Sequence, residues 1–522
     1  MSTQIRWQVP KELSAAEQRV AQKLRRIGKF YVFLREIRAE LFDDAFQAEL
    51  AAAYRPRGVA PLPPALLAMV TLLQAYDQVG DAEAVVAAEL DPRWQMPLGC
   101  LGATDAPFSQ GALVKFRERM IAHDLDQKLL DRTVALAKQT GRFGWQALRA
   151  ALDSSPLVGA GRVEDTWNLI GRALRTVATC AAKTLKVSRD QVLRDAGVTL
   201  LGTASLKAAL DIDWGDPAAQ ADALTRVLTE VDRLEQWVAT QAPVADAPPV
   251  QAALKALRRV LTQDVEPDPT TGHRRIRRGV AAERMPSLGD PEMRHGRKTR
   301  TRLFTGYKRH VIKLVDADVI VGAIVRPANE PEHQALSLLT PAVTQHGPLA
   351  EVLMDRGYLG SPHVGDLHAQ GVAIRAKAWT STNGGRFPKH AFEIRLADAH
   401  VICPAQHTAV IPVGAPTIHF PATVCQPCDL RPACTTAAAG RGRSVAIHPQ
   451  EALLQTLRTA QRQPQGRVRL RQRTTIEHSL ARVNQIQGPK ARYKGIRKNT
   501  LDVRRVAVIT NLQRLARLPK AA

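Results

Sequence analysis

Three acidic residues that are distant in the sequence have the setting of a site that cuts phosphodiesters. Residues 350–354 form an apolar run that ends in Asp355, and residues 148–152 form another that ends in Asp153. Turn-forming residues follow both, which indicates buried strands that each deliver a carboxylate to the rim of a sheet. The third acid, Glu477, lies far downstream on a basic segment with helical character. Two strand-end aspartates and one helical glutamate are suited to hold two divalent metal ions, the equipment for cutting and joining phosphodiesters.

The expected metal follows from the chemistry of these three side chains. Carboxylate oxygens are the ligands that Mg²⁺ prefers, and Mn²⁺ shares this preference. Without a cation, three converging carboxylates would repel one another. We therefore expect Asp153, Asp355 and Glu477 to bind Mg²⁺ (or Mn²⁺). Asp165 is an alternative to the first acid, although a turn residue is the commoner role for an aspartate just beyond a strand. Three further acids fit turns and are interpreted as structural: Asp290, Asp316 and Asp318.

The charge of the chain points to nucleic acid as the substrate. The net charge is +24, of which residues 272–310 carry +9 and residues 466–522 carry +13. Both basic segments border the proposed acids, and the rest of the chain is nearly neutral. Concentrated positive charge beside acidic residues favours phosphate binding over a merely solvated surface.

Length and composition exclude several other classes of protein. A chain of 522 residues is too long for one core, and 45% hydrophobic with 23% charged residues is ordinary for a soluble protein. We found no run of eighteen apolar residues and no signal-like N-terminus, so we expect no membrane span and a cytoplasmic, nucleoid-associated protein. Six cysteines in a chain of this size do not indicate a disulfide framework.

The elements that must position the acids follow from periodicity and turn signals. Residues 1–144 predict an N-terminal helical domain, including a helix from Pro64 and another capped by Ser109. Strands, a hairpin and helices then alternate as expected for a mixed α/β unit. The predicted strands are 147–152, 307–315, 319–326, 350–355 and 372–377, and the predicted helices between them are 331–345 and 361–370.

Two insertions divide this α/β unit. The predicted catalytic core consists of residues 145–164, 286–377 and 466–522. Residues 165–285 predict a helical insertion, and residues 378–465 predict an irregular, cysteine-bearing one. The N-terminal domain is assigned to binding DNA ends or to dimerisation.

Several motifs in a specific order resemble the DDE-type transposases of bacterial insertion sequences. The resemblance is to the branch with an N-terminal helical domain, a ribonuclease-H-like catalytic domain and a cysteine-bearing insert. Its motifs are spread over most of the chain: Leu152-Asp-Ser-Ser-Pro156, Val163-Glu-Asp-Thr166, Gly289-Asp-Pro-Glu292, Gly306-Tyr-Lys-Arg-His310, Arg326-Pro-Ala-Asn-Glu330, Met354-Asp-Arg-Gly-Tyr358, Thr475-Ile-Glu-His-Ser-Leu480 and Arg504-Arg-Val-Ala-Val-Ile-Thr-Asn-Leu512.

This resemblance implies a fold and a function. The fold would be α/β, a ribonuclease-H-like mixed sheet with flanking helices, plus the N-terminal all-α domain and the two insertions. Asp153, Asp355 and Glu477 would be the catalytic, metal-binding triad. The activity would be metal-dependent cleavage at transposon ends and strand transfer into target DNA, with a homodimer in the DNA complex. Two alternatives remain: a ribonuclease-H-like DNA nuclease without strand transfer, and a non-catalytic DNA-binding protein derived from a transposase.

The sequence departs from the related pattern around Glu477. Related families place a Tyr seven residues before the Glu, an Arg four before it and a Lys seven after it. Arg473 matches the Arg, but Leu470 and Asn484 occupy the other two places. Other cations must then bind the phosphates, and the run from Lys490 to Lys498 interleaves them with an aromatic residue as a DNA-tracking segment does. The expected DNA-binding residues are Lys308, Arg309, Arg473, Arg482, Lys490, Arg492, Lys494, Arg497 and Lys498.

Four cysteines in the second insertion have the spacing of a metal site. Cys403, Cys425, Cys428 and Cys434 follow the pattern C-x21-C-x2-C-x5-C, and four thiolates suit tetrahedral Zn²⁺. A structural zinc ion would stiffen an irregular segment that has little core of its own. The competing interpretation is that they are small buried residues in a turn-rich segment.

Overall fold

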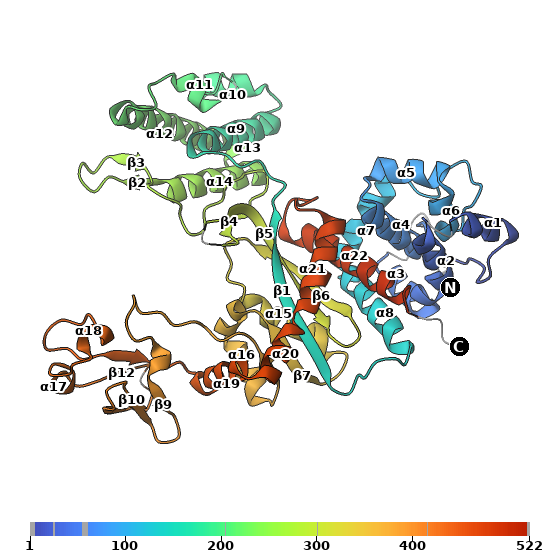
Figure 1. Ribbon diagram of the computed structural model, residues 1–522. Coiled ribbons are helices and arrows are strands. Elements are labelled where there is room, and N and C mark those ends of the chain that lie inside the picture. Colours follow the sequence, from blue (N-terminus) through green and yellow to red (C-terminus); the bar gives the residue numbers. More distant parts are fainter. Residues whose placement is uncertain are drawn as a thin grey trace.

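The computed structural model describes residues 6–24, 27–54, 61–203, 205–299, 301–414 and 416–518. A mixed sheet lies at the centre, with the N-terminal helices on one side, a helical insertion at one end of the sheet and the cysteine-bearing insertion at the other (Figure 1). This confirms the predicted fold class, α/β with an N-terminal all-α region. None of the helices in the described part of the chain has the length and apolar character needed to cross a membrane.

The N-terminal region is built from eight helices in the described residues. They are α1 (Ala15–Lys23), α2 (Lys29–Leu41), α3 (Asp44–Ala52), α4 (Pro64–Asp77), α5 (Asp81–Leu90), α6 (Pro92–Leu98), α7 (Gln110–Ala122) and α8 (Leu125–Gln139). Helix α4 begins at Pro64 and α7 is capped by Ser109, whose hydroxyl accepts the Ala112 N–H, as predicted. Most of α4 is buried, because other helices surround it.

The central sheet is a mixed sheet of six strands. Its strands are β1 (Leu148–Val158), β4 (Arg294–Arg297), β5 (Leu303–Leu314), β6 (Val319–Pro327), β7 (Leu349–Met354) and β8 (Ala373–Arg375). The order is β4-β5-β1-β7-β8, and β6 also pairs with β5. Strands β1, β7 and β8 are parallel, whereas β5 is antiparallel to both β1 and β6. The predicted hairpin is thus β5–β6, and β1 lies in the middle.

The first predicted strand is longer than expected. Strand β1 was predicted to end at Leu152, but its pairing with β5 continues to Val158. Pairing with β7, in contrast, stops at Leu152 opposite Met354. Asp153 therefore lies within the strand, at the point where one neighbouring strand ends. The backbone nitrogen of Pro156 faces the edge of β1 along which β7 pairs only as far as Leu152. Its missing N–H therefore breaks no hydrogen bond between strands, and the proline is tolerated.

Helices cover both faces of the sheet. Helices α15 (Gln334–Thr344) and α16 (Pro362–Ala369) fill the positions predicted for helices between the later strands. Helix α21 (Thr474–Gln487) lies along β1, and α22 (Ile496–Leu515) packs on β6 (Figure 1).

The helical insertion has its own hydrophobic core. It consists of α9 (Thr166–Leu185), α10 (Arg189–Asp195), α11 (Leu206–Leu210), α12 (Pro217–Thr240), α13 (Ala242–Ala245), α14 (Pro248–Asp264) and a short β2 (Val265–Pro267)–β3 (Arg274–Ile276) pair. Because its apolar faces turn inward on one another, it forms a separate unit that continues directly from the end of β1.

The cysteine-bearing insertion is more regular than predicted. Two small sheets form around a core of Phe392, Val401, Ile418 and Phe420. The chain then returns to the sheet through α19 (Glu451–Arg462) and α20 (Pro464–Arg471). The elements of the insertion are β9 (Glu393–Arg395), β10 (His400–Ile402), β11 (Thr408–Val410), β12 (Thr417–His419), β13 (Ser444–Ala446), α17 (Ala422–Cys425), α18 (Arg431–Cys434) and the short 3-10 turn Lys389–Ala391.

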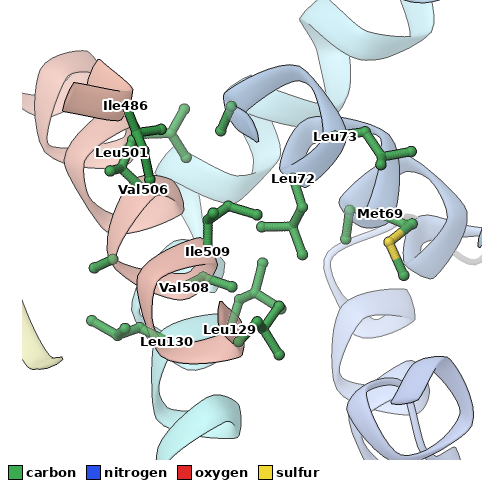
Figure 2. Close-up of a cluster of buried hydrophobic side chains, with 14 of the residues drawn as sticks. Met69, Leu72, Leu73, Leu129, Leu130, Ile486, Leu501, Val506, Val508 and Ile509 are labelled. Atoms are coloured by element: carbon green, nitrogen blue, oxygen red, sulfur yellow. The ribbon is translucent and has the colours of Figure 1, made fainter. Parts of the chain in front are cut away.

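The two ends of the chain share one core. Figure 2 shows apolar side chains of α4 and α8 meeting those of α22, among them Leu72, Leu129, Val508 and Ile509. All four are almost completely buried. Since buried apolar surface stabilises by about 25 cal/mol per Å², this contact fixes the N-terminal helices to α22.

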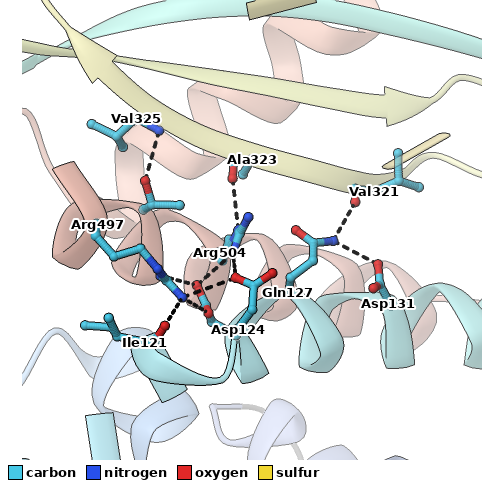
Figure 3. A network of polar contacts seen from close by, with 11 residues as sticks. Ile121, Asp124, Gln127, Asp131, Val321, Ala323, Val325, Arg497 and Arg504 are labelled. Carbon is cyan, nitrogen blue, oxygen red and sulfur yellow. Dashed lines mark hydrogen bonds and ion pairs between the residues drawn. The ribbon is translucent and has the colours of Figure 1, made fainter. Parts of the chain in front are cut away.

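Ion pairs surround this shared core. Asp126, at the start of α8, accepts hydrogen bonds from Arg497 (2.5 and 2.8 Å) and Arg504 (3.2 Å) of α22. The two arginines also bind Asp124, and Arg504 donates to the Ala323 carbonyl of β6 (Figure 3). The Asp126 side chain is completely buried, so its charge depends on these two cations.

We predict that Asp126→Ala destabilises the protein, because it leaves two partly buried guanidinium groups without their main partner. Removing one partner of a buried ion pair costs about 3 kcal/mol or more. As a control, Lys128→Ala breaks the Lys128–Glu49 pair, whose side chains are 42% and 43% exposed, and should cost less than about 1 kcal/mol. Thermal unfolding followed by circular dichroism compares the two, and equal midpoints would contradict the role given to Asp126.

Candidate active site

Asp153 and Asp355 are brought side by side by the parallel pairing of β1 and β7. The last paired residues are Leu152 and Met354, so the next residue on each strand is an aspartate. The pKa of Asp153 is raised above its ordinary value, first because the carboxyl is buried and then because Asp355 and Glu332 are close; the Ser154 N–H and Arg473 act in the opposite direction. The end of the β1–β7 ladder is therefore an acidic site, in which Asp355 and Glu332 act on the carboxyl of Asp153.

Glu477 reaches this site from the other side of β1. It lies in the first turn of α21, and its side chain is 49% exposed. Arg473, one helical turn earlier, donates to Asp153 Oδ2 at 3.1 Å and to Glu477 Oε1 at 2.5 Å. The structure thus gathers all three predicted acids, with the guanidinium of Arg473 between two of them.

A fourth carboxylate, Glu332, was not found by sequence reasoning. It stands just before α15, and its Oε1 accepts a hydrogen bond of 2.7 Å from Ser154 Oγ, next to Asp153. Gly357 makes room for it, since a Cβ at that position would lie 2.8 Å from Glu332 Oε2. The signal that could have revealed it is its place two residues after the Arg326–Glu330 motif.

A buried contact between two side chains stabilises the turn that follows Asp355. Tyr358, three residues after Asp355, has its hydroxyl 2.9 Å from Nδ1 of His310 on β5. Complete burial, with Lys308 and Arg326 nearby, lowers the pKa of His310 to about 3, so the imidazole is neutral. This neutral contact fixes the turn without adding a charge beneath the acids.

The donor set suits a hard divalent cation, although the side chains are not arranged around one. The charged groups at this site that could ligate a metal ion are carboxylates, which matches the preference of Mg²⁺ and Mn²⁺. Within the described ranges, no group of three or more His, Cys, Asp or Glu side chains is positioned to hold a metal ion. Arg473 accounts for this at the acidic site, because its guanidinium neutralises Asp153 and Glu477 and lies where a cation would otherwise balance them.

The other acids that the sequence raised have structural positions. Asp165 caps α9 by accepting the N–H groups of Trp167 and Asn168. Asp290 is buried and accepts hydrogen bonds from the Tyr307 hydroxyl and the Gly495 N–H, so it holds the basic loop after α21. The remaining two lie in or beside the β5–β6 turn and pair with cations: Asp316 with Arg149, and Asp318 with Lys313 and Arg514.

The predicted DNA-binding residues divide into exposed and occupied groups. Lys490, Arg492, Lys494 and Lys498 are exposed in and just after the loop between α21 and α22. This loop is fixed to the end of β1, because Ala491 donates to the Val158 carbonyl and Val158 donates to that of Pro489.

Four other predicted cations are already bound to protein groups. Arg309 is 1% exposed, and its guanidinium binds Ser155, Gln487 and backbone carbonyls. Arg497 belongs to the Asp126 network, Arg482 binds Gln513 and Gln485, and Lys308 donates to the Glu330 carbonyl. Arg309 in particular joins β5 to α21 rather than presenting a cation to solvent, so we leave it out of the proposed interface.

The four cysteines of the second insertion line one small cavity. The cavity has a volume of about 20 Å³ and is bordered by Cys403, Cys425, Cys428 and Cys434, with His407 beside them. All four are free thiols. The pKa of Cys434 is raised, first by burial and further by the other three sulfur atoms, while Arg443 opposes the shift. The cluster therefore exists in the fold, although its side chains are not placed around a metal ion.

Comparison with known proteins supports the same family at both ends of the chain. A model of a transposase domain (DUF772) matches residues 19–119, which span α1 to most of α7. A model described as a transposase DDE domain matches residues 404–516, which include Glu477, Arg473 and all of α22. Asp153 and Asp355 lie outside both matches. The search of curated proteins and the search of solved structures returned no match. Together with the mixed α/β fold, the two matches support a DDE-type transposase of an insertion sequence.

Proposed function

We propose that this transposase cleaves DNA at transposon ends and transfers the freed strand into target DNA in a metal-dependent reaction. The observation that carries the proposal is that Asp153 and Asp355 lie side by side at the end of the β1–β7 ladder and that Arg473 links Asp153 to Glu477. Phosphodiester transfer needs charge neutralisation at the entering and leaving oxygens, which two bound Mg²⁺ or Mn²⁺ ions supply. Asp153 and Asp355 would hold these ions, and Glu477 would complete the second position.

Arg473 has two roles in this proposal. Before DNA binds, its positive charge compensates the negative charges of Asp153 and Glu477, whose mutual repulsion would otherwise push the two carboxylates apart. Its forked guanidinium also matches the geometry of a phosphate. With Asp153 and Glu477 holding divalent cations, Arg473 would be free to bind a phosphate oxygen of the DNA strand beside Glu477.

The strand chemistry requires two successive displacements at phosphorus. Water attacks the phosphorus at the transposon end, and the 3′-oxygen leaves with a proton. The freed 3′-hydroxyl then attacks a target phosphorus and displaces the target strand's 3′-oxygen. Joining two ends to one target needs two active sites, so we propose that the protein acts as a homodimer on DNA.

We further propose that Glu332 belongs to the acidic site. Its hydrogen bond to Ser154 fixes it beside Asp153, and it helps to raise the pKa of that aspartate. In this role it increases the local negative potential that attracts divalent cations.

For the cysteine cavity we propose a structural Zn²⁺ held by Cys403, Cys425, Cys428 and Cys434. Support comes from four thiols bordering a cavity of about 20 Å³, which is atom-sized rather than ligand-sized. The surrounding core contains few large apolar residues, so a metal ion would contribute much of the stability of this insertion.

We predict that Asp355→Asn abolishes cleavage without weakening DNA binding. The amide cannot neutralise a cation, so nicking of a terminal-repeat duplex in Mg²⁺ should fall by at least about a hundredfold. Affinity for the duplex should stay equal or rise, because a phosphate-repelling charge is gone. Asp366→Asn, on the exposed face of α16, is the matched control and should cut normally.

The same assay separates the alternative functions. Wild-type protein that nicks the duplex but never joins it to a plasmid would be a nuclease without strand transfer. Wild-type protein that binds the duplex and never nicks it would be a non-catalytic DNA-binding protein. Full activity of Asp355→Asn would remove that residue from the mechanism.

Glu332→Gln tests the fourth carboxylate, because it keeps the hydrogen bond to Ser154 and removes only the charge. We expect the Mg²⁺ concentration for half-maximal nicking to rise several-fold with little change in thermal stability. Glu393→Gln, an exposed residue of the cysteine-bearing insertion, should leave the Mg²⁺ dependence as it is. An unchanged Mg²⁺ requirement in Glu332→Gln would assign Glu332 a purely structural role.

The zinc proposal predicts about one Zn²⁺ per chain in elemental analysis of the purified protein. Cys428→Ser should reduce the zinc content and lower the thermal midpoint of the insertion, whereas Cys180→Ser, in the helical insertion, should change neither. Zinc-free protein of full stability would leave only the packing interpretation of these cysteines.

A further inference from the structure

A basic cavity lies where the helical insertion joins the catalytic core. It has a volume of about 470 Å³ and is bordered by residues after β1, on α9 and in the loop before α22. Four cations line it, and Glu164 is the one carboxylate among the residues that border it. The cations are Arg162, Arg172, Arg175 and Lys494.

The four cations face the cavity and have few partners in the protein. Nη2 of Arg172 and Nζ of Lys494 lie 3.3 and 3.5 Å from the position that a Cβ would take on Gly289, so both reach the same point. Glu164 pairs only with Arg172, at 3.1 Å, and Arg175 donates to the Thr203 carbonyl. Arg162 and Lys494 make no hydrogen bond or ion pair with any residue in the described ranges. This leaves an excess of positive charge facing a solvent-filled space, which an anion would balance.

The position of the cavity relative to the acids indicates which anion. The second half of strand β1 runs from Asp153 to Val158. The loop that carries Lys494 is hydrogen-bonded to Val158 through residues 489 and 491. Five strand residues span roughly 17 Å, which is the axial length of about five base pairs of DNA. Figure 1 shows the helical insertion beyond this end of β1, with α21 along the same strand. A duplex cut at the acids would therefore pass the cavity within half a helical turn.

We infer that the helical insertion is a DNA-binding arm, and that its cavity holds a backbone phosphate about five nucleotides from the bond that the acids cut. This inference rests on the proposed function, because it takes transposon DNA as the substrate. Arg162 and Lys494 bind the phosphate directly, while Arg172 and Arg175 line the cavity and fix its shape. The contact is with the backbone, so it positions the DNA and carries no sequence information.

The test is the salt dependence of DNA binding by the full-length double variant Arg162→Gln/Lys494→Gln. A labelled duplex from the element's own end is titrated at several NaCl concentrations in EDTA, so that neither metal nor cleavage contributes. Each lost phosphate contact lowers the magnitude of the slope of log K against log salt by about 0.9, so loss of the one phosphate held in the cavity should lower it by about that amount. At 0.1 M salt the affinity should fall roughly tenfold or more.

The matched control removes the same charge elsewhere on the insertion. Arg226 and Lys255 are exposed on α12 and α14 and do not border the cavity. Arg226→Gln/Lys255→Gln should keep the wild-type slope and affinity. Equal losses in both double variants would mean that only overall charge matters, and an unchanged slope in the cavity variant would also overturn the inference. Circular dichroism confirms that both variants fold.

A second measurement locates the phosphate. Single neutral methylphosphonate linkages are placed along the end duplex, and the wild-type protein should lose affinity at a linkage about five nucleotides from the cleaved bond. The cavity variant should be insensitive to that substitution. Sensitivity at the same position in both proteins would show that another group binds this phosphate. Because binding is read in EDTA, these results stand or fall independently of whether the acids cut DNA.

Discussion

Mutual repulsion among carboxylates is the constraint on which the rest of this structure depends. Asp153, Asp355, Glu332 and Glu477 are held at one end of the β1–β7 ladder, and burial of Asp153 makes its charge still less favourable. Arg473 relieves part of this strain by binding Asp153 and Glu477 together. The remainder must be carried by a rigid scaffold. The buried His310–Tyr358 contact, the close approach at Gly357 and the long β5 partner of β1 all serve that rigidity.

Strand β1 joins the acidic site to the basic loop between α21 and α22. At Asp153 it loses β7 as a neighbour, and further along, at Val158, it gains the basic loop between α21 and α22 instead. Arg309 and Asp290 hold these parts from within: Arg309 joins β5 to the end of α21, and Asp290 binds the loop at Gly495. The buried hydrogen bonds of Arg309 and of Asp290 Oδ1 favour a single arrangement of these parts. The spacing between the acids and the exposed cations is therefore fixed by one strand and not by a flexible linker.

Much of this architecture was accessible from the sequence. Apolar runs bounded by turn residues predicted β1, β5, β6, β7 and β8, and capping signals at Ser109 and Pro64 predicted helix starts, because these features depend on local chemistry. The end of β1 was wrong for the same reason. Ser154 to Pro156 are turn-forming residues by local preference, yet pairing with β5 carries the strand through them. Long-range pairing overrides such preferences.

The site shows the same division. Asp153, Asp355 and Glu477 were identified because each has a local setting that stands out. Glu332 has a weaker signal, its place two residues after the Arg326–Glu330 motif, and its contact with Ser154, 178 positions away in sequence, is what assigns it to the site. Nor does a sequence distinguish cations that face solvent from those already bound. Arg309 and Lys490 look alike in the chain, but one is buried among carbonyls and the other exposed.

The joining of both chain ends in one core has a consequence for biosynthesis. Helices α4 and α8 pack against α22, which begins about 350 residues after α8 ends. At a translation rate of about 5–20 residues per second, those helices wait roughly 20–70 s on the ribosome before their partner emerges. During this interval the parts of these helices that α22 covers (Figure 2) are exposed, and Glu477 has not yet joined Asp153 and Asp355. A chain that stops before α21 therefore exposes part of an apolar core and carries no assembled acidic site.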